Sequence, residues 1–277
     1  MRAEVLVRAV RSCRTWRVRG WATGLGVPLI AAMTLLSGCG SQVDGAAGAN
    51  PLGSRAPGWG SVTGSGRLAS RTLDLSRVSA VTVGASFQVQ LKMGQPARAT
   101  VRMNDSLTDR VEASVVGDEL RLDLKPGESV RNASLSAQLV VGRLERLAAS
   151  GASRVELATP VTSPALQLTG AGASAITGPV MAGQVRADVS GASTLALSGQ
   201  AQALQLTATG TCRMPLSQFT ARRLDADLSG VSRASVTVSD QLAARTSGVS
   251  VLEYRGFPAV TRAQAVGISS IQHDSDE

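Results

Sequence analysis

Gly151-Ala152-Ser153, Gly172-Ala173-Ser174 and Gly191-Ala192-Ser193 open a series of seven similar triplets in the C-terminal half of the sequence. The series continues with Gly210-Thr211-Cys212, Gly230-Val231-Ser232, Gly248-Val249-Ser250 and Gly267-Ile268-Ser269. Successive glycines are 21, 19, 19, 20, 18 and 19 residues apart. Such a steady period is typical of a solenoid, in which each copy is one coil that cannot bury its apolar face alone.

Apolar residues fall into columns when the copies are aligned on their glycines. The columns are Leu166, Val185, Leu204, Leu224 and Leu242; Leu168, Ala187, Leu206, Ala226 and Ala244; Val155, Ile176, Leu195, Met214, Ala234 and Leu252; and Leu157, Leu197, Leu216, Val236 and Tyr254. They alternate with polar positions at a period of two, which predicts parallel strands stacked about 4.8 Å apart. The sequence therefore predicts an all-β fold, a right-handed parallel β-helix with coils of about 19 residues. About ten such coils would form a rod of about 50 Å.

The triplets themselves have a structural interpretation. Glycine marks a corner where the backbone needs a positive φ or a close approach to the next coil. Serine would then point inward as a ladder of hydroxyls, and Cys212 would be a buried, inert thiol in the same slot. The functional alternative is an exposed row of serines that binds a sugar or another surface.

Alternating apolar residues also precede the repeats, from Val78 to Val141. The dipeptide Gly117-Asp118 predicts a tight hairpin, and residues 104–109 predict one helical turn. Gly84-Ala85-Ser86 is interpreted as an outlying copy of the triplet.

This order of strands resembles the bacterial family called head GIN domain, auto-transporter adhesin, which is a domain of unknown function. The residues that carry the resemblance are Val83–Leu91, Gly94, Ala99-Thr100-Val101, Leu107, Val111, Val115, Gly117, Leu120-Arg121-Leu122 and the repeats that follow. The resemblance covers about residues 68–272 and implies a right-handed parallel β-helix in exported proteins, often lipoproteins. The sequence departs from the family pattern at Cys212 and at Gly84-Ala85-Ser86, where a Gly-Ile-Asn triplet is missing. The family has no established active site, so it assigns no functional residue.

Residues 1–38 are predicted to be a lipoprotein signal peptide. An arginine-rich head precedes an apolar run, from Trp21 to Leu36, that is short for a transmembrane span. The run ends in Leu36-Ser37-Gly38-Cys39, which resembles the bacterial lipobox and implies that the Cys39 thiol is lipidated. Gly40, where the inner-membrane retention signal has aspartate, implies outer-membrane sorting in a Gram-negative cell envelope. An ordinary signal peptide, or a core helix with a chance cysteine, is the alternative.

Three further segments are predicted. Residues 39–66 are the lipidated cysteine and a tether of Gly, Ala, Ser and Pro that buries too little surface to fold. Residues 67–272 form the head GIN-like β-helix, and residues 273–277 are a polar tail.

Charge and composition argue against several function classes. Six arginines and one glutamate lie in the first 20 residues, so the rest of the chain carries only +3 of the net charge of +8. A nucleic-acid partner is therefore not expected. Neither Cys212 nor the single histidine, His273, has metal-ligand spacing around it, so neither a metal nor a cofactor is expected.

Two outward columns are the candidate functional surface. They are Thr169, Asp188, Thr207, Asp227 and Arg245, and beside them Gln167, Arg186, Gln205, Asp225 and Ala243. Asp188 and Asp227 would lie about 9–10 Å apart, two coils along, at the upper edge of the separation in inverting glycosidases. No histidine or aromatic sugar platform accompanies them, and Arg245 next to Asp227 indicates an ordinary surface pair.

The sequence therefore favours a non-catalytic, lipid-anchored envelope protein whose β-helix is a scaffold or an adhesin-like binding surface for a glycan or a protein. The alternative is a carbohydrate-active β-helix enzyme, a polysaccharide hydrolase or lyase that uses Asp188, Asp225 and Asp227. An accessory role in envelope assembly or stress is also compatible with the sequence.

Overall fold

The computed structural model describes residues 61–275, all within one compact unit, Arg55–Glu277. The predicted signal peptide, Cys39 and most of the tether lie outside the described residues. The unit encloses a hydrophobic core of its own, so we expect it to fold without the residues before it. No helix in the described range is long and apolar enough to cross a bilayer.

The described residues form 19 strands and one short 3-10 helix. The strands before the repeats are β1 (Ser61–Thr63), β2 (Leu68–Asp74), β3 (Ala80–Val83), β4 (Gln88–Met93), β5 (Arg98–Asn104), β6 (Val111–Val116), β7 (Glu119–Leu124), β8 (Ser129–Arg131) and β9 (Leu135–Val141). The strands of the repeats are β10 (Arg146–Ala149), β11 (Arg154–Leu157), β12 (Val161–Gly170), β13 (Ala175–Gly191), β14 (Thr194–Gly210), β15 (Arg213–Gly230), β16 (Arg233–Gly248), β17 (Val251–Arg255), β18 (Ala259–Gly267) and β19 (Ser270–His273).

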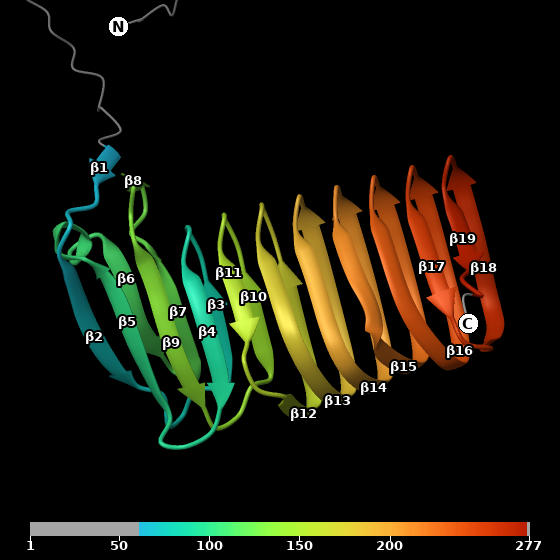
Figure 1. Ribbon diagram of the computed structural model, residues 1–277, viewed down its shortest axis with the longest axis horizontal. Coiled ribbons are helices and arrows are strands. Elements are labelled where there is room, and N and C mark those ends of the chain that lie inside the picture. The colour runs from blue at the N-terminus through green and yellow to red at the C-terminus, as the bar shows by residue number, and fades with distance from the viewer. Residues whose placement is uncertain (1–60, 276–277) are drawn as a thin grey trace, which may run out of the picture. The chain divides into compact units, whose positions relative to one another are not determined.

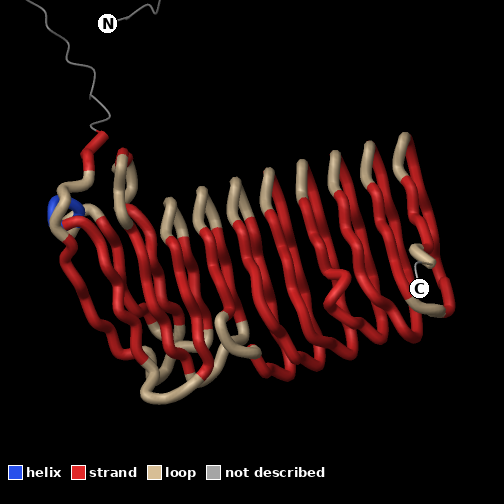
Figure 2. The backbone as a smooth tube through the Cα atoms, viewed as in Figure 1, coloured by secondary structure: helices blue, strands red, loops and turns tan. Residues whose placement is uncertain are grey.

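Each coil contributes to two layers. β11 pairs with the start of β13, Ala175–Thr177, whereas β12 pairs with Val180–Val189 of the same strand. β13 therefore bends from one layer to the other, and β14, β15 and β16 repeat this course as parallel neighbours. Figures 1 and 2 show the coils stacked side by side, each with a strand in the front layer and one in the back. The predicted parallel β-solenoid is confirmed.

The predicted apolar columns are confirmed by the register. Leu166 pairs with Val185, Val185 with Leu204, and Leu204 with Leu224. These residues and those of the neighbouring columns are buried between the two layers, where they form a single core; only Tyr254, at the end of its column, is partly buried. Alternate residues of each strand point outward, as the period of two predicted.

The N-terminal strands depart from the simple solenoid. β2 pairs antiparallel with β5, β5 antiparallel with β9, and β6 antiparallel with β7. The prediction of about ten coils is therefore wrong, and the solenoid has about seven. An alternating pattern sets which face of a strand is buried but not the direction of its neighbour, so it could not distinguish the two arrangements.

Two local predictions upstream of the repeats are confirmed. Gly117, with φ +64°, and Asp118 connect β6 to β7 as a two-residue hairpin loop. The helical turn is a 3-10 helix at Asp105–Leu107. The predicted tether reaches residue 66, but Ser61–Thr63 is already strand β1 and pairs with β8.

The repeated glycines are the corners between the layers. Gly191 has φ +74°, and a Cβ placed on it would lie 2.5 Å from the carbonyl oxygen of Gly172 in the preceding coil. That oxygen accepts a hydrogen bond of 2.7 Å from the amide of Ala192. The other corners from Gly172 to Gly248 repeat this arrangement, so both the positive φ and the close stacking require glycine.

The serines of the triplets form the predicted inward ladder. The Ser193 hydroxyl donates to the carbonyl oxygen of Ser190 over 2.8 Å, and the Ser174 hydroxyl lies 3.2 Å from that of Ser193. Cys212 occupies the next position, buried, with its sulfur 3.5 Å from the carbonyl oxygen of Thr209. The triplets are therefore structural corners rather than an exposed row of hydroxyls.

The outlying triplet at Gly84 is shifted by one residue. The Ala152 amide donates to the carbonyl oxygen of Ala85, so Ala85 stacks on Gly151 and adopts a positive φ of 53°. Phe87, fully buried, then takes the slot that serine fills elsewhere. Gly84 itself is packed against the carboxyl group of Asp123.

Candidate functional site

The two predicted outward columns lie side by side on one layer. We call this surface, formed by the outward residues of β10, β12 and the second halves of β13 to β16, the polar face. Gln167 pairs with Arg186, Arg186 with Gln205, and Gln205 with Asp225. The Gln167 column begins one coil earlier than the sequence alignment indicated, at Arg146, which pairs with Gln167. A regular array of amide, guanidinium and carboxylate groups results.

Ion pairs tie several of these groups together. Arg186 bonds to Asp188 on its own strand, with Nε 3.0 Å from the carboxylate. Arg146 bonds to Asp118 at 2.9 Å. The expected pair between Asp227 and Arg245 is wrong. The two residues are neighbours in the register, but the Arg245 guanidinium donates instead to the amide oxygen of Gln264, at 3.1 and 3.3 Å.

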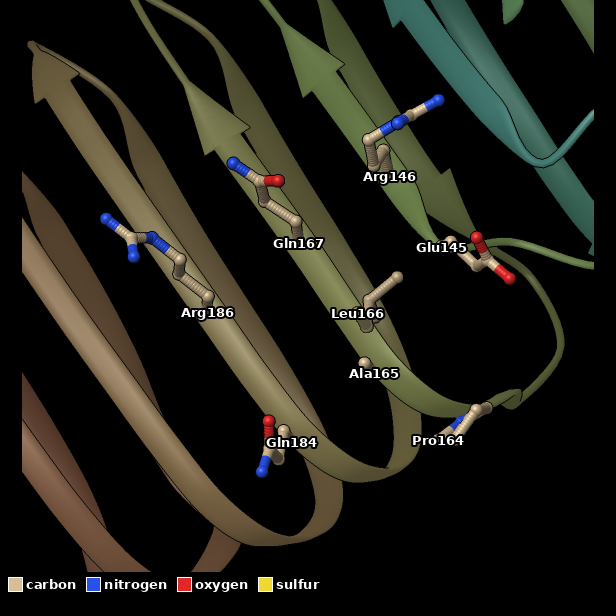
Figure 3. A pocket seen from close by; sticks show the side chains of 8 residues that line it. All are labelled: Glu145, Arg146, Pro164, Ala165, Leu166, Gln167, Gln184 and Arg186. Carbon is tan, nitrogen blue, oxygen red and sulfur yellow. The ribbon is translucent and has the colours of Figure 1, made fainter. Parts of the chain in front are cut away.

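A depression of about 400 Å³ opens on the polar face where the regular coils begin. Its lining residues are Glu145, Arg146, Pro164, Ala165, Leu166, Gln167, Gln184 and Arg186. Figure 3 shows Arg146, Gln167 and Arg186 in a row across three neighbouring strands, with Gln184 nearer the bend of its coil. The row follows the register of β10, β12 and β13, so its spacing is that of the strands, about 4.8 Å.

A second depression, of about 380 Å³, continues the first. Pro164 and Gln184 line both, and the second is completed by Gly183, Gln202, Ala203, Arg222, Arg223 and Asp240. We call the two together the polar groove. Arg222 bonds to Asp240 at 3.0 Å and to Gln202 at 3.2 Å, so its guanidinium is held across the groove. Four arginines against two acidic residues give the lining a positive balance.

Three carboxyl groups on or beside the polar face have a pKa below the ordinary value. The Ser79 hydroxyl, followed by the charge of Arg146, lowers the pKa of Asp118. The Thr82 hydroxyl and then Arg121 lower the pKa of Glu119. The Ser239 hydroxyl and then Arg222 lower the pKa of Asp240. Each group is thus held ionised, the opposite of what a general acid needs.

The candidate acids Asp188, Asp225 and Asp227 all lie on the polar face. Asp188 and Asp227 are two strands apart with Thr207 between them, and Asp225 precedes Asp227 by two residues on the same strand. None of the three lines the polar groove. In residues 61–275 no group of three or more His, Cys, Asp or Glu is arranged to hold a metal ion.

Within residues 61–275 the aromatic side chains and the histidine lie away from this surface. His273, at the C-terminal end, contacts the rings of Tyr254 and Phe257 and bonds to the carbonyl oxygen of Gly256. Phe87 and Phe219 are buried in the core. What the polar face offers a ligand is therefore hydrogen bonding and charge rather than ring stacking.

The family described as "Putative auto-transporter adhesin, head GIN domain" matches residues 77–258, well over half of the chain. The chain belongs to the head GIN domain family. The match lies inside the predicted range of about 68–272 and takes in the antiparallel pairs β5–β9 and β6–β7 as well as the coils up to β17, whereas β2, β18 and β19 lie just outside it.

Solved structures share the fold of this head GIN domain. One from Bacteroides fragilis, named a putative adhesin, is 16% identical and superposes with a TM-score of 0.72 over 77% of this chain and 100% of its own. One from Parabacteroides merdae, also named a putative adhesin, is 16% identical, with a TM-score of 0.66 over 77% of this chain and 99% of its own. One from Parabacteroides distasonis, named a putative lipid binding protein, is 14% identical, with a TM-score of 0.62 over 78% and 100%. A comparison with curated proteins finds no match.

The polar face of this head GIN domain could be predicted from the sequence, but its groove could not. Extending the Gln167 column by one coil would have reached Arg146. Arg222 and Asp240 could not have been paired from the sequence, because the register between β15 and β16 shifts at Leu216/Thr220 and again at Ala221/Arg223. Cys39 lies outside the described residues, and its lipidation stays a prediction.

Proposed function

We propose that this protein is a lipid-anchored component of the cell envelope whose polar groove binds an acidic glycan without cleaving it. The membership in a family of adhesin-like proteins supports an envelope or cell-surface location. The lipobox at Leu36–Cys39 supports lipidation of Cys39, and Gly40 supports sorting to the outer membrane. A multiply acylated cysteine supplies the two or more membrane signals that stable anchoring requires.

The observation that carries the binding proposal is the row of Arg146, Gln167 and Arg186. Guanidinium and amide groups donate hydrogen bonds in a plane and suit carboxylate, sulfate and hydroxyl groups. Because the row repeats at the strand spacing, which is close to the length of a sugar ring, successive sugars of one chain can meet successive strands.

The geometry also favours binding over hydrolysis. A hydrogen bond from the Ser239 hydroxyl and then the charge of Arg222 lower the pKa of Asp240, a carboxyl group in the groove, which disfavours the protonated form that a proton donor in glycoside cleavage needs. Asp188 is engaged by Arg186. The alternative hypothesis is a polysaccharide hydrolase or lyase that uses Asp188, Asp225 and Asp227. One experiment distinguishes binding from cleavage.

The experiment incubates residues 55–277 with a panel of neutral, carboxylated and sulfated glycans and measures both retention of the protein and new reducing ends. Retention on acidic glycans with no new reducing ends is the expected result. Cleavage that disappears in Asp188→Asn and Asp227→Asn would establish the enzyme instead. No retention on any acidic glycan would reject the groove as a glycan site.

A further inference from the structure

The last coil leaves the inner columns of the solenoid uncovered. Leu242, Ala244 and Thr246 of β16 are buried. Their partners one coil later are Val260, Ala263 and Ala265 of β18, and all three are exposed, Val260 by 49%. The core column therefore continues to the end of the stack, where part of it meets solvent.

The backbone of this coil is also open along one edge. β18 pairs only with β16 and β19 only with β17, so the other edge of each strand has no partner among the described residues. β18 is nine residues long, and every one of them is exposed. Long edge strands are normally guarded by charges, proline or a covering segment, yet β18 has one charged residue, Arg262, and no proline.

Large apolar side chains are also exposed on this last coil. Phe257 is 93% exposed and Ile268 82% exposed, and Val266 is also exposed. Together with Val260 they lie within twelve residues of the sequence, on the coil that ends the stack in Figure 1. Phe257 precedes β18 and Ile268 follows it, so these apolar residues are spread along the whole open strand, which suits it to contact with another molecule.

At the opposite end of the domain the core is covered, although β2 and β6 each pair with one strand only among the described residues. The antiparallel strands and the 3-10 helix cover the core there, and Met103 and Leu107 are buried. The edge strand β2 carries Arg71 and Asp74 and follows Arg67, charges of the kind that guard an edge.

We propose that the C-terminal coil docks on the C-terminal coil of a second copy about a two-fold axis, so that the two solenoids join end to end. A coil edge is the surface that best matches another coil edge in width and hydrogen bonding. The coil is almost uncharged, so two identical surfaces meet without repulsion. Because a two-fold contact uses the C-terminal coil of both copies, it closes as a dimer rather than growing into a fibre. Under the two-fold axis the strands that meet run antiparallel.

Residues 55–277 test this by sedimentation velocity and light scattering over a range of concentrations. The expected species is a dimer, with no larger assembly. Val260→Arg and Ala263→Arg are expected to give monomers with an unchanged circular dichroism spectrum, because both positions are exposed. Val116→Arg, on β6 at the other end and 55% exposed, is the matched control and is expected to stay dimeric.

Hydrogen exchange locates the contact. The backbone amides of β18 and β19 are expected to be protected at concentrations where the dimer forms and unprotected after dilution to the monomer. A monomer at every concentration, a dimer that Val116→Arg abolishes while Val260→Arg does not, protection of β18 in the monomer by another part of the chain, or a ladder of longer assemblies would each overturn the proposal.

Discussion

The carbonyl oxygen of Gly172 accepts a hydrogen bond from the amide of Ala192, one coil further along, at 2.7 Å. A side chain on Gly191, the residue before Ala192, would collide with this oxygen, because its Cβ would lie 2.5 Å away. Because the same contact recurs from corner to corner, the glycines fix where each coil turns, and thereby which outward residues align on the polar face.

Gly191→Ala is expected to destabilise the domain by at least about 1–3 kcal/mol, since alanine would have to hold a positive φ and its Cβ would collide with Gly172. Two controls separate these causes. Gly117 also has a positive φ but open space around its Cβ position, so Gly117→Ala should show only the backbone cost, whereas Gly66→Ala should be near neutral. Chemical denaturation of each variant measures the free energy of unfolding, and equal costs at Gly191 and Gly117 would contradict the stacking argument.

The serine ladder predicts a contrast between two substitutions. Ser193→Ala removes a buried hydroxyl that bonds to the Ser190 carbonyl, and we expect a loss of about 1–2 kcal/mol. Cys212→Ser places a hydroxyl in a slot that serine fills in neighbouring coils, so its effect should be smaller. Thermal and chemical unfolding check both, and a Cys212→Ser variant less stable than Ser193→Ala would show that the slot at Cys212 is not equivalent.

Stability should fall in acid. The folded-state pKa values of Asp118 and Glu119 lie below their ordinary values of 3.8 and 4.5, so the unfolded chain takes up protons first as the pH falls. The stability that these two carboxyl groups contribute is present above about pH 4.5 and is lost as the pH falls through their lowered folded-state pKa values. Thr82→Val removes the hydroxyl that lowers the Glu119 pKa most, and should raise that pKa toward 4.5 in a carboxyl NMR titration. An unchanged Glu119 pKa in this variant would refute the assigned cause.

The regular coils could be predicted from the sequence because one physical rule, the burial of alternate residues, acts identically in every copy. Val185 and Leu204 occupy equivalent places, and so do Ser174 and Ser193. Alternation does not specify strand direction, which is why the antiparallel pairing of β2 and β5 was not foreseen. Near the N-terminal end the corner is formed by Ala85, which has a positive φ. A prediction based on glycine places this corner one residue too early, at Gly84.

The site could be predicted only as a surface. The two columns followed from the repeat, but the groove depends on where the bends of successive coils lie and on which partner each arginine selects. Arg245 reaches Gln264 rather than its register neighbour Asp227. Arg222 reaches Asp240 across an irregular stretch of β15 and β16. Side-chain choices of this kind are not encoded in the spacing of the repeats.

The proposed lipid anchor predicts a clean change in cell fractionation. Cys39→Ala removes the thiol that would take the diacylglyceryl group, so the protein should move from the membrane fraction to the soluble fraction. Cys212→Ser, which alters a buried thiol of the folded domain, should leave the protein in the membrane fraction. Retention of the Cys39→Ala protein in the membrane fraction would contradict the anchor.

The most direct test of the polar groove is the affinity of residues 55–277 for an acidic glycan that they retain, measured for Arg186→Ala and Arg71→Ala. The two variants lose the same charge, but Arg186 lines the groove and Arg71 lies on the distant strand β2. A loss of about tenfold or more for Arg186→Ala, with Arg71→Ala close to the unaltered protein, is the expected result, since hydrogen bonds to charged groups contribute about 1.5–3 kcal/mol. Equal losses in the two variants would show that the glycan responds to net charge alone and would contradict the groove as the binding site.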